Sequence, residues 1–424
     1  MLWLLLGCRP EPVTSPDIVI LLAAGLRSDT TDVLLEGLQR TPSARFTAAY
    51  SQSSSPFVSL GSLLIGDYPA AAPMCGLTVR SGPPPDPPIW CNQLPEGRWT
   101  LPEVLETYSY RTALFTNNLR GGRFLAGEFQ VGRESTDPAS DAVAWWKEGN
   151  GPRLLVIADA SPMMRRTTFW AEQQVARPDR SEVPGSITDM RTEPLEAAQE
   201  AYQEEIRALG QRWRTLLDGL SGEEELLILA GLNGINLGEQ SGSPTLPPII
   251  LFNDIILERT VHVPLMVFSQ TPLQLSSDDP VELLDVLPTV VAAAGAMPVT
   301  GLPGRDLLDG TPEADSYAYS ELGDMISLRK GEYMLSFRGM LHHATSLDPK
   351  LTQVLMGKPH RLMLHNVVHD PAQGNSLTRE KPALADQLLD ELRAVRLGPA
   401  APSMDVLTPE LVQQLRAVQR DGYW

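Results

Sequence analysis

The serine-rich stretch from Ala49 to Pro69, AYSQSSSPFVSLGSLLIGDYP, holds the residues best suited to covalent chemistry. A turn that leads into a helix of small residues is how several hydrolases present a nucleophilic hydroxyl. The candidate hydroxyls belong to Ser53, Ser54, Ser55 and Ser59. A serine nucleophile needs a base beside it, and all six histidines lie at or beyond His262. We therefore favour a polar turn that bonds its own backbone.

The same stretch resembles the nucleophile segment of the sulfatase branch of the alkaline phosphatase superfamily. That segment typically reads AYSQAPWTLPSHASLLTGLYP, which aligns without a gap from Ala49 to Pro69. The family's nucleophile, a Cys, Ser or Thr, falls on Pro56, which has no nucleophilic atom. Ser55 and Ser59 are nearby hydroxyls, one residue or more out of register. The resemblance implies that the scaffold of the segment is kept and its nucleophile is lost.

Two further segments resemble the metal-binding motifs of that family. PDIVILLAAGLRSD is similar to the opening strand and turn VILISIDTLRADHLG, whose first metal-binding Asp falls on Ala24 and whose neighbour falls on Gly25. LLILAGLNGINLGEQ is similar to VVVTSDHGENLGEHG, whose Asp-His pair falls on Leu232 and Asn233. A cation in such a site needs carboxylate oxygens or imidazole nitrogens, and a lone amide holds calcium only weakly. The resemblance thus implies former metal positions, no bound metal and no cofactor.

The resemblance also points to pocket-lining residues. Asn118 falls on the family's Asn in the helix and strand WTLPEVLETYSYRTALFTNN, where an ordinary turn residue is the favoured alternative. Met163 takes the place of a family His after the strand RLLVIADASPMM. Asp29 completes the candidate pocket.

Four aspartates are the candidate replacements for the lost ligands. Convergence of Asp29, Asp32, Asp159 or Asp254 with Asn233 around an empty polar pocket would indicate a rebuilt metal site. For Asp29 and Asp32 we favour carboxylates at a helix start, where the helix dipole stabilises them.

The histidines offer a weaker metal signal. His342 and His343 are adjacent, and His365 and His369 have i,i+4 spacing, but both pairs fall in the region that resembles an antiparallel sheet. Since i,i+4 residues share a face only on a helix, we expect surface histidines there.

Periodicity predicts the elements that would position these residues. Pro16 to Ala24 is an unbroken apolar run, typical of a parallel strand buried on both faces. Ile206, Leu209 and Trp213 begin a helical stripe that faces a core. The resemblance runs from Pro16 to about Val395 and implies an α/β/α sandwich with a mainly parallel sheet and a smaller C-terminal antiparallel subdomain. We expect a leader and spacer over 1–15, the α/β domain over 16–315 and the subdomain with tail helices over 316–424.

Composition and termini bear on location. A formal net charge of −18 argues against nucleic acid and anionic membrane surfaces as partners. The start MLWLLLGCRPEP resembles a bacterial lipobox with Cys8 as the lipidated residue; an ordinary apolar terminus is the alternative. Cys75 and Cys91 bracket a proline-rich loop, and in an exported protein we expect them to form a disulfide rather than remain free thiols.

Two functions follow from these observations. The first is an inactive, sulfatase-like lipoprotein that binds or scaffolds a protein or glycan in the bacterial periplasm or at the outer membrane, with a secreted form as the alternative. The second is an active sulfate- or phosphate-ester hydrolase with rearranged ligands. We expect the first, because the nucleophile and metal positions are all degenerate.

Overall fold

The computed structural model describes residues 15–71, 98–117, 125–163, 192–220, 226–237, 239, 256–269, 280–309, 316–322, 325–338 and 362–397. Several residues named above lie outside these ranges: Cys8, Cys75, Cys91, Asn118, Asp254, His342 and His343. None of the described helices combines the length and apolar character needed to cross a bilayer.

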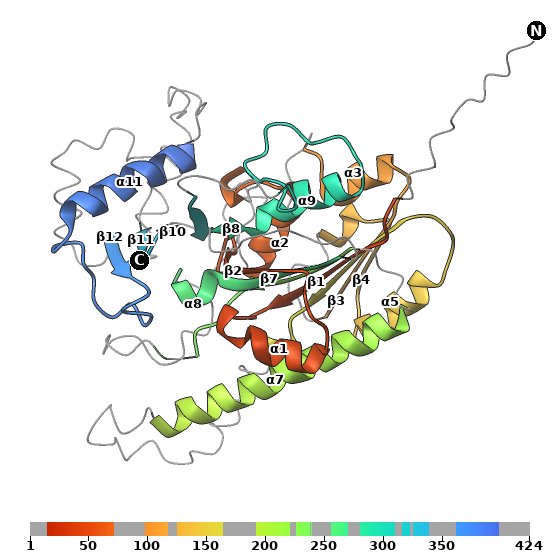
Figure 1. Ribbon diagram of the computed structural model, residues 1–424, viewed down its shortest axis with the longest axis horizontal. Coiled ribbons are helices and arrows are strands. Elements are labelled where there is room, and N and C mark those ends of the chain that lie inside the picture. Colours follow the sequence, from red (N-terminus) through yellow and green to blue (C-terminus); the bar gives the residue numbers. More distant parts are fainter. Residues whose placement is uncertain are drawn as a thin grey trace, which may run out of the picture.

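The centre of the molecule is an eight-stranded sheet with the order β4-β3-β5-β1-β6-β7-β2-β8 (Figure 1). Its strands are β1 (Ile18–Ala24), β2 (Ala44–Tyr50), β3 (Arg111–Asn117), β4 (Val131–Glu134), β5 (Arg153–Asp159), β6 (Leu226–Asn233), β7 (His262–Ser269) and β8 (Val281–Glu282). All neighbouring pairs are parallel except those of β7, which runs antiparallel to both β6 and β2. Every residue of β1 and β6 is buried, as the apolar run predicts.

Helices cover both faces of this sheet. One face carries α2 (Pro56–Ile65), α3 (Leu101–Thr107) and α9 (Val286–Ala293), and the other carries α1 (Thr31–Leu38), α5 (Pro138–Trp146) and α7 (Thr192–Gly219). Alternate residues of β1 enter the two cores: Ile18, Ile20 and Leu22 enter one, and Val19, Leu21 and Ala23 enter the other. The predicted α/β/α sandwich is thus confirmed.

Short helical turns connect these elements. They are η1 (Ser28–Thr30), η2 (Pro69–Ala71), η3 (Ala126–Glu128), α8 (Glu258–Val261) and η4 (Leu283–Asp285). Of these, η1 directly follows β1, and α8 leads directly into β7.

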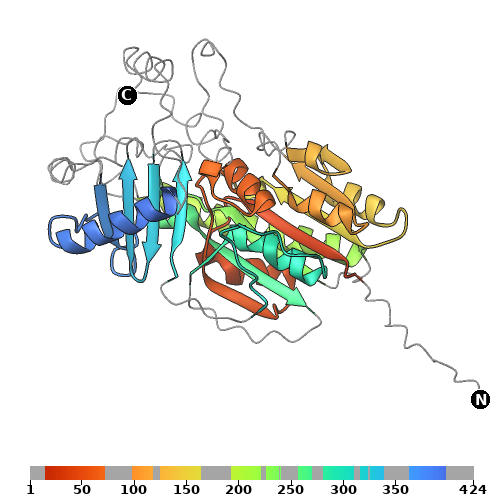
Figure 2. The same cartoon turned by 90° about the horizontal axis from the view of Figure 1, so that it is seen from above.

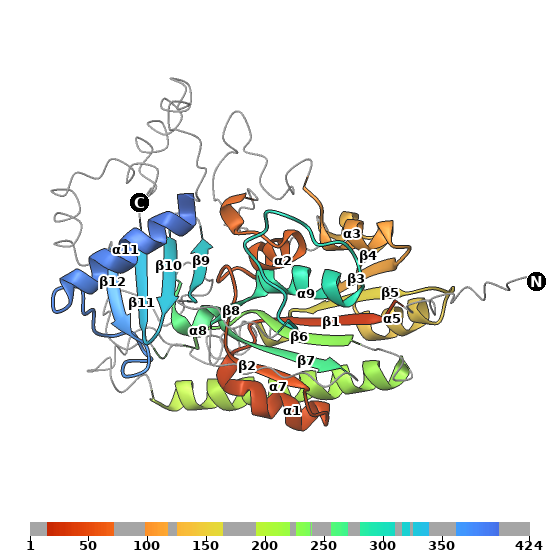
Figure 3. The same cartoon turned by 45° about the horizontal axis from the view of Figure 1, so that its top comes forward.

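A second, antiparallel sheet follows, with the order β12-β11-β10-β9. It consists of β9 (Ala318–Leu322), β10 (Met325–Lys330), β11 (Tyr333–Arg338) and β12 (Leu362–Asn366), and α11 (Pro382–Leu397) lies across it (Figure 3). Residues such as Leu328, Leu335 and Leu388 fill the layer beneath α11. The opposite face packs on the large domain around Tyr50 and Met334, so the small sheet sits beside the large one (Figure 2). The predicted antiparallel subdomain is confirmed.

Candidate functional site

Asn233 joins three chain segments at the carboxyl ends of β1 and β6. Ala24 lies opposite Asn233 in the parallel ladder, after a shift of register that follows Ala23. The Gly25 N–H donates to Asn233 Oδ1 at 3.0 Å, while Nδ2 donates to the carbonyls of Ser54 at 3.0 Å and Gly234 at 2.8 Å. The side chain is completely buried. Both ends of the amide are therefore used inside the fold.

The other former metal and nucleophile positions supply no ligand atom. Ala24 and Leu232 are fully buried members of the hydrophobic core. Pro56 is the first residue of α2, and it is buried too. Proline suits this position because its ring holds φ at a helical value and the helix requires no N–H there. These three residues stabilise the local backbone, and none has an oxygen or nitrogen on its side chain.

The hydroxyls of three serines, Ser51, Ser53 and Ser59, form hydrogen bonds with the backbone of the serine-rich segment. The hydroxyls of Ser51 and Ser59 both donate to the Ser53 carbonyl at 2.9 Å, and Ser53 Oγ accepts from the Ser55 N–H at 3.2 Å. Ser59 is fully buried. Because the protons of Ser51 and Ser59 point to a carbonyl instead of a base, these contacts stabilise a turn and do not activate a nucleophile.

Gly25 and Met163 fill the place beside Asn233. Gly25 has φ of +79°, and a Cβ there would lie 3.2 Å from the Met163 backbone nitrogen. Met163 in turn packs against both hydrophobic cores. The close approach of Met163 explains why a residue with a side chain is disfavoured at position 25.

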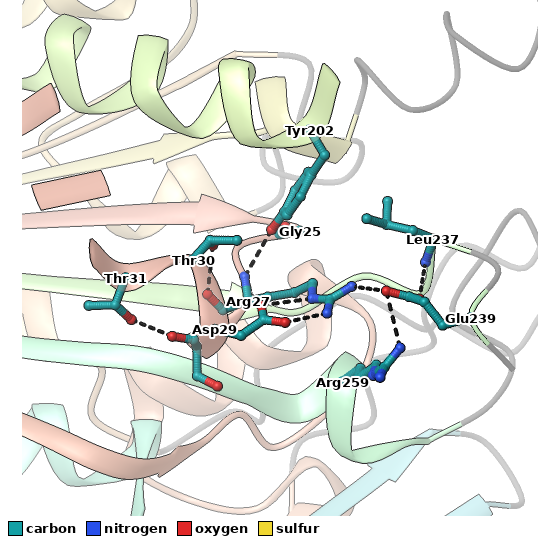
Figure 4. A network of polar contacts seen from close by, with 10 residues as sticks. Gly25, Arg27, Asp29, Thr30, Thr31, Tyr202, Leu237, Glu239 and Arg259 are labelled. Carbon is teal, nitrogen blue, oxygen red and sulfur yellow. Dashed lines mark hydrogen bonds and ion pairs between the residues drawn. The ribbon is translucent and has the colours of Figure 1, made fainter. Parts of the chain in front are cut away.

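Arg27 anchors a buried ionic network just beyond Gly25 (Figure 4). Its guanidinium contacts the carboxylates of Asp29 and Glu239, and Arg259 pairs with Glu239 at 3.1 Å. Glu239 also accepts from the Leu237 N–H at 2.9 Å. Burial alone would raise the pKa of Glu239, but the adjacent Arg27 and Arg259 outweigh it and lower the pKa overall. The network holds the segment after β6 against the segment after β1.

The hydroxyl of Tyr202, in α7, forms hydrogen bonds with the backbone of the same turn. Its hydroxyl accepts from the Arg27 N–H at 3.0 Å and donates to the Gly25 carbonyl at 2.7 Å. Sequence reasoning missed Tyr202 and Arg259 as part of this site. In the sequence, Tyr202 lies one helical turn before Ile206 and extends the apolar stripe of that helix. This position predicts burial of Tyr202 but does not predict its hydrogen bonds.

The remaining candidate carboxylates are engaged elsewhere. Asp29 pairs with Arg27, and exposed Asp32 pairs with Arg45 at 2.7 Å. Asp159, which is 4% exposed, accepts from the side-chain amide of Asn117 at 2.9 Å. No contact joins these three described carboxylates to Asn233, whose hydrogen bonds run to Gly25, Ser54 and Gly234.

The prediction of surface histidines is wrong for His365. This residue lies in β12 and is 4% exposed, and burial lowers its pKa. His369 follows the strand and is exposed. The sheet pairing places His365 opposite Met334, on the face that meets the large domain. Within the described ranges, no three His, Cys, Asp or Glu residues are grouped so that they could hold a metal ion.

Comparison with known proteins identifies the architecture. No family model and no curated protein matches the chain. A putative sulfatase from Bacteroides thetaiotaomicron superposes with a TM-score of 0.62 at 16% identity, covering 89% of this chain and 92% of that one. The chain has the alkaline phosphatase-like fold.

Other solved structures with this fold include a 2-O GAG sulfatase (TM-score 0.61, 15% identity, 89% and 91% of the two chains). The phosphonate monoester hydrolase of Agrobacterium radiobacter is similar as well (TM-score 0.60, 13% identity, 90% and 95%). Identities this low establish a shared fold, so the chemistry of this chain has to be argued from its own residues.

Proposed function

We propose that this chain is a non-catalytic, sulfatase-fold protein that binds or scaffolds another molecule in a bacterial cell envelope. The hydrogen bonding of Asn233 carries the proposal. An amide whose oxygen accepts from Gly25 and whose nitrogen donates to two carbonyls acts as a structural cross-link. At the position where the sulfatase family binds a metal, hydrogen bonds of Asn233 therefore connect the chain segments directly.

The donor set does not fit a catalytic cation. Sulfuryl or phosphoryl transfer on this fold requires several oxygen or nitrogen ligands and an activated nucleophile that converge on one point. Ala24 and Leu232 offer hydrocarbon, and Pro56 offers no nucleophile. Asp29 and Asp32 pair with arginines, and Asp159 accepts from an amide. A hydrolase with a rearranged site is the competing function.

The first experiment measures metal content by plasma mass spectrometry, together with release of 4-nitrophenol from its sulfate and phosphate esters. We expect no stoichiometric metal and no turnover from the purified wild-type chain. Stoichiometric metal with turnover would overturn the proposal. In that event Asp29→Asn and Asp159→Asn would test the rebuilt site, because loss of metal and activity in either variant identifies a ligand and retention in both excludes these two carboxylates.

The envelope location rests on the lipobox-like sequence before Cys8, and the envelope partner would be a protein or a glycan. We expect radiolabelled palmitate to be incorporated by a bacterial host into the wild-type chain and not into Cys8→Ser. Incorporation by both, or by neither, would contradict lipidation at Cys8.

Thiol alkylation with and without reductant tests the proposed Cys75–Cys91 disulfide in the same preparation. We expect these two cysteines to be alkylated only after reduction.

A further inference from the structure

Glu282 is a buried carboxyl group at the junction of the two sheets. It is 7% exposed and ends β8. Its Oε1 accepts from the Tyr319 N–H at 2.8 Å and from Gln52 Nε2 at 3.2 Å, and its Oε2 is hydrogen-bonded to the Tyr68 hydroxyl at 2.9 Å. One carboxyl group thus joins β9, the serine-rich segment and the turn after α2.

The same junction pairs the outer edge of β9 with the segment Ser51–Gln52. The Glu321 N–H donates to the Gln52 carbonyl at 2.8 Å, and the Ser320 hydroxyl donates to the Ser51 carbonyl at 2.6 Å. The rings of Tyr68 and Tyr319 meet edge to face with centroids 4.9 Å apart. Movement of Glu282 would therefore disturb the pairing of β9 with this segment.

No cation balances Glu282 among its contacts in the described part of the chain. The titratable residues in contact with it are Tyr68, Tyr319 and Asp285. One contact further away, Tyr317 lies beside Tyr68 and Glu321 accepts from the Tyr319 hydroxyl. The Glu282 N–H donates to Asp285 Oδ2 at 2.8 Å, which brings a second carboxylate close by. The guanidinium of Arg305 donates to the Pro280 carbonyl at 3.2 Å. An ionised carboxylate in this setting is unfavourable because its burial is not offset by an opposite charge.

Glu258 shows the opposite arrangement at the same interface. This residue is 8% exposed, pairs with Arg329 at 3.3 Å and lies 3.4 Å from His262 Nδ1. Burial alone would raise its pKa, but His262, Arg329 and the Tyr50 hydroxyl lower it overall. Among the described contacts at this interface, Glu258 thus has cationic partners and Glu282 has none.

We propose that Glu282 is an uncharged carboxylic acid in the closed interface, with its proton on Oε2 and directed to the Tyr68 hydroxyl oxygen 2.9 Å away. It then acts as a latch: separating β9 from the serine-rich segment releases this proton to water. Rising pH then loosens the C-terminal sheet at this edge, while the ion pair between Glu258 and Arg329 remains. The inference does not depend on the protein being non-catalytic.

The direction and range of the effect follow from the titration. Burial, with a further contribution from Asp285, raises the pKa of Glu282 to about 8, while its hydrogen-bond donors offset part of that rise. The stabilisation is complete below the ordinary carboxyl pKa and is lost as pH rises toward the folded value. Opening should therefore increase about tenfold per pH unit between about pH 5 and about pH 8, and then level off.

Amide hydrogen exchange measured by mass spectrometry tests this latch. The readout is the ratio of exchange rates in wild type and Glu282→Gln at the same pH, so intrinsic exchange cancels. For peptides covering Ala318–Leu322 and residues 51–55, we expect the ratio to rise with pH as stated and to reach a plateau above about pH 8. A ratio that does not change with pH would overturn the proposal. An equal change in the exchange of β9 and β1 peptides would also overturn the proposal, because the whole molecule would then be opening.

Glu258→Gln is the matched control. It leaves Arg329 and His262 without their carboxylate, so we expect faster exchange of the β9 peptide than in wild type at every pH. Glu282→Gln should instead slow that exchange relative to wild type above about pH 5, by a factor that grows until about pH 8, since glutamine stays neutral. If Glu282→Gln also accelerates exchange at every pH, the native group is an ionised carboxylate and the proposal fails.

If Glu282→Gln does not fold, infrared titration of the wild-type chain tests whether Glu282 is protonated at neutral pH. A protonated carboxylic acid has a C=O stretch distinct from that of an ionised carboxylate. We expect an acid band that persists at neutral pH and disappears near pH 8, and its absence at neutral pH would overturn the latch.

Discussion

At the scale of single residues, Asn233 is the side chain on which the former site most depends. Replacing it by Asp keeps the shape but removes the two Nδ2 protons that satisfy the carbonyls of Ser54 and Gly234. A carboxylate would then face carbonyl oxygens in a fully buried position. We expect Asn233→Asp to lower the free energy of unfolding by about 3 kcal/mol, measured by urea denaturation.

Ser62→Ala is the control for this experiment. Ser62 is equally buried and lies in α2, and its hydroxyl has no hydrogen-bond partner among the residues that the structure describes. We expect Ser62→Ala to change stability by less than about 1 kcal/mol. Equal effects of the two substitutions would show that Asn233 is not a cross-link, and a more stable Asn233→Asp protein in the presence of calcium would indicate a latent metal site.

Gly25 is constrained twice, by its backbone conformation and by Met163. With φ of +79° and a potential Cβ 3.2 Å from the Met163 nitrogen, Gly25→Ala should lower the free energy of unfolding by about 2 kcal/mol. Gly295→Ala separates the two causes, because Gly295 has φ of +67° with nothing within 4 Å of a Cβ. A similar loss in both variants would mean that Met163 does not restrict position 25.

At the scale of elements, the crossing of α1 and α7 depends on two glycines. A Cβ on Gly210 would lie 2.4 Å from the Leu34 carbonyl oxygen, and one on Gly37 would lie 2.3 Å from that of Arg207. Because both clashes are with backbone, the helices would have to move apart. We expect Gly210→Ala to lower the free energy of unfolding by roughly 1–3 kcal/mol in chemical denaturation.

Gly127→Ala provides the comparison for that crossing. A Cβ at Gly127 would meet no atom of the described residues within 4 Å, and Gly127 lies in the short turn η3. Its substitution should leave stability within about 0.5 kcal/mol of wild type. If Gly210→Ala is tolerated equally well, the helices do not pack as closely as described.

At the scale of the whole molecule, the contact between the sheets should make stability depend on pH through His262. Burial alone would lower the pKa of His262, but Glu258 and the Thr47 carbonyl raise it overall. A raised histidine pKa contributes stability that is complete below about pH 6.5 and is lost as pH rises through the folded value. Glu258, whose pKa is lowered, contributes above about pH 4.5 and loses its contribution in acid.

The difference in melting temperature between wild type and His262→Gln isolates this effect. Glutamine does not titrate, so the advantage of the wild-type chain should be greatest between about pH 5 and about pH 6.5 and should shrink by about pH 8. Thermal unfolding followed by circular dichroism gives the curve. A constant difference over that range would contradict a charged contact between His262 and Glu258.

Much of the architecture follows from the sequence, because periodicity is a local property. The apolar run of β1 and the stripe from Ile206 identify a buried strand and a core-facing helix. The ordered matches to the sulfatase branch predict the sandwich and the smaller sheet, and the structure confirms both. The absence of ligand atoms from Ala24, Pro56 and Leu232 can likewise be read from residue identity alone.

Only the tertiary structure decides what the polar residues do, because their partners are distant in sequence. Asn233 bonds Gly25 and Ser54, more than 170 residues away, and Tyr202 reaches the turn at Gly25 from another layer. Burial of His365 depends on packing between two sheets, so neither spacing nor residue type reveals it. The charge states of Glu258 and Glu282 differ for the same reason. Glu258 has an arginine and a histidine beside it, which stabilise its ionised form. Glu282 has a second carboxylate beside it, which disfavours ionisation.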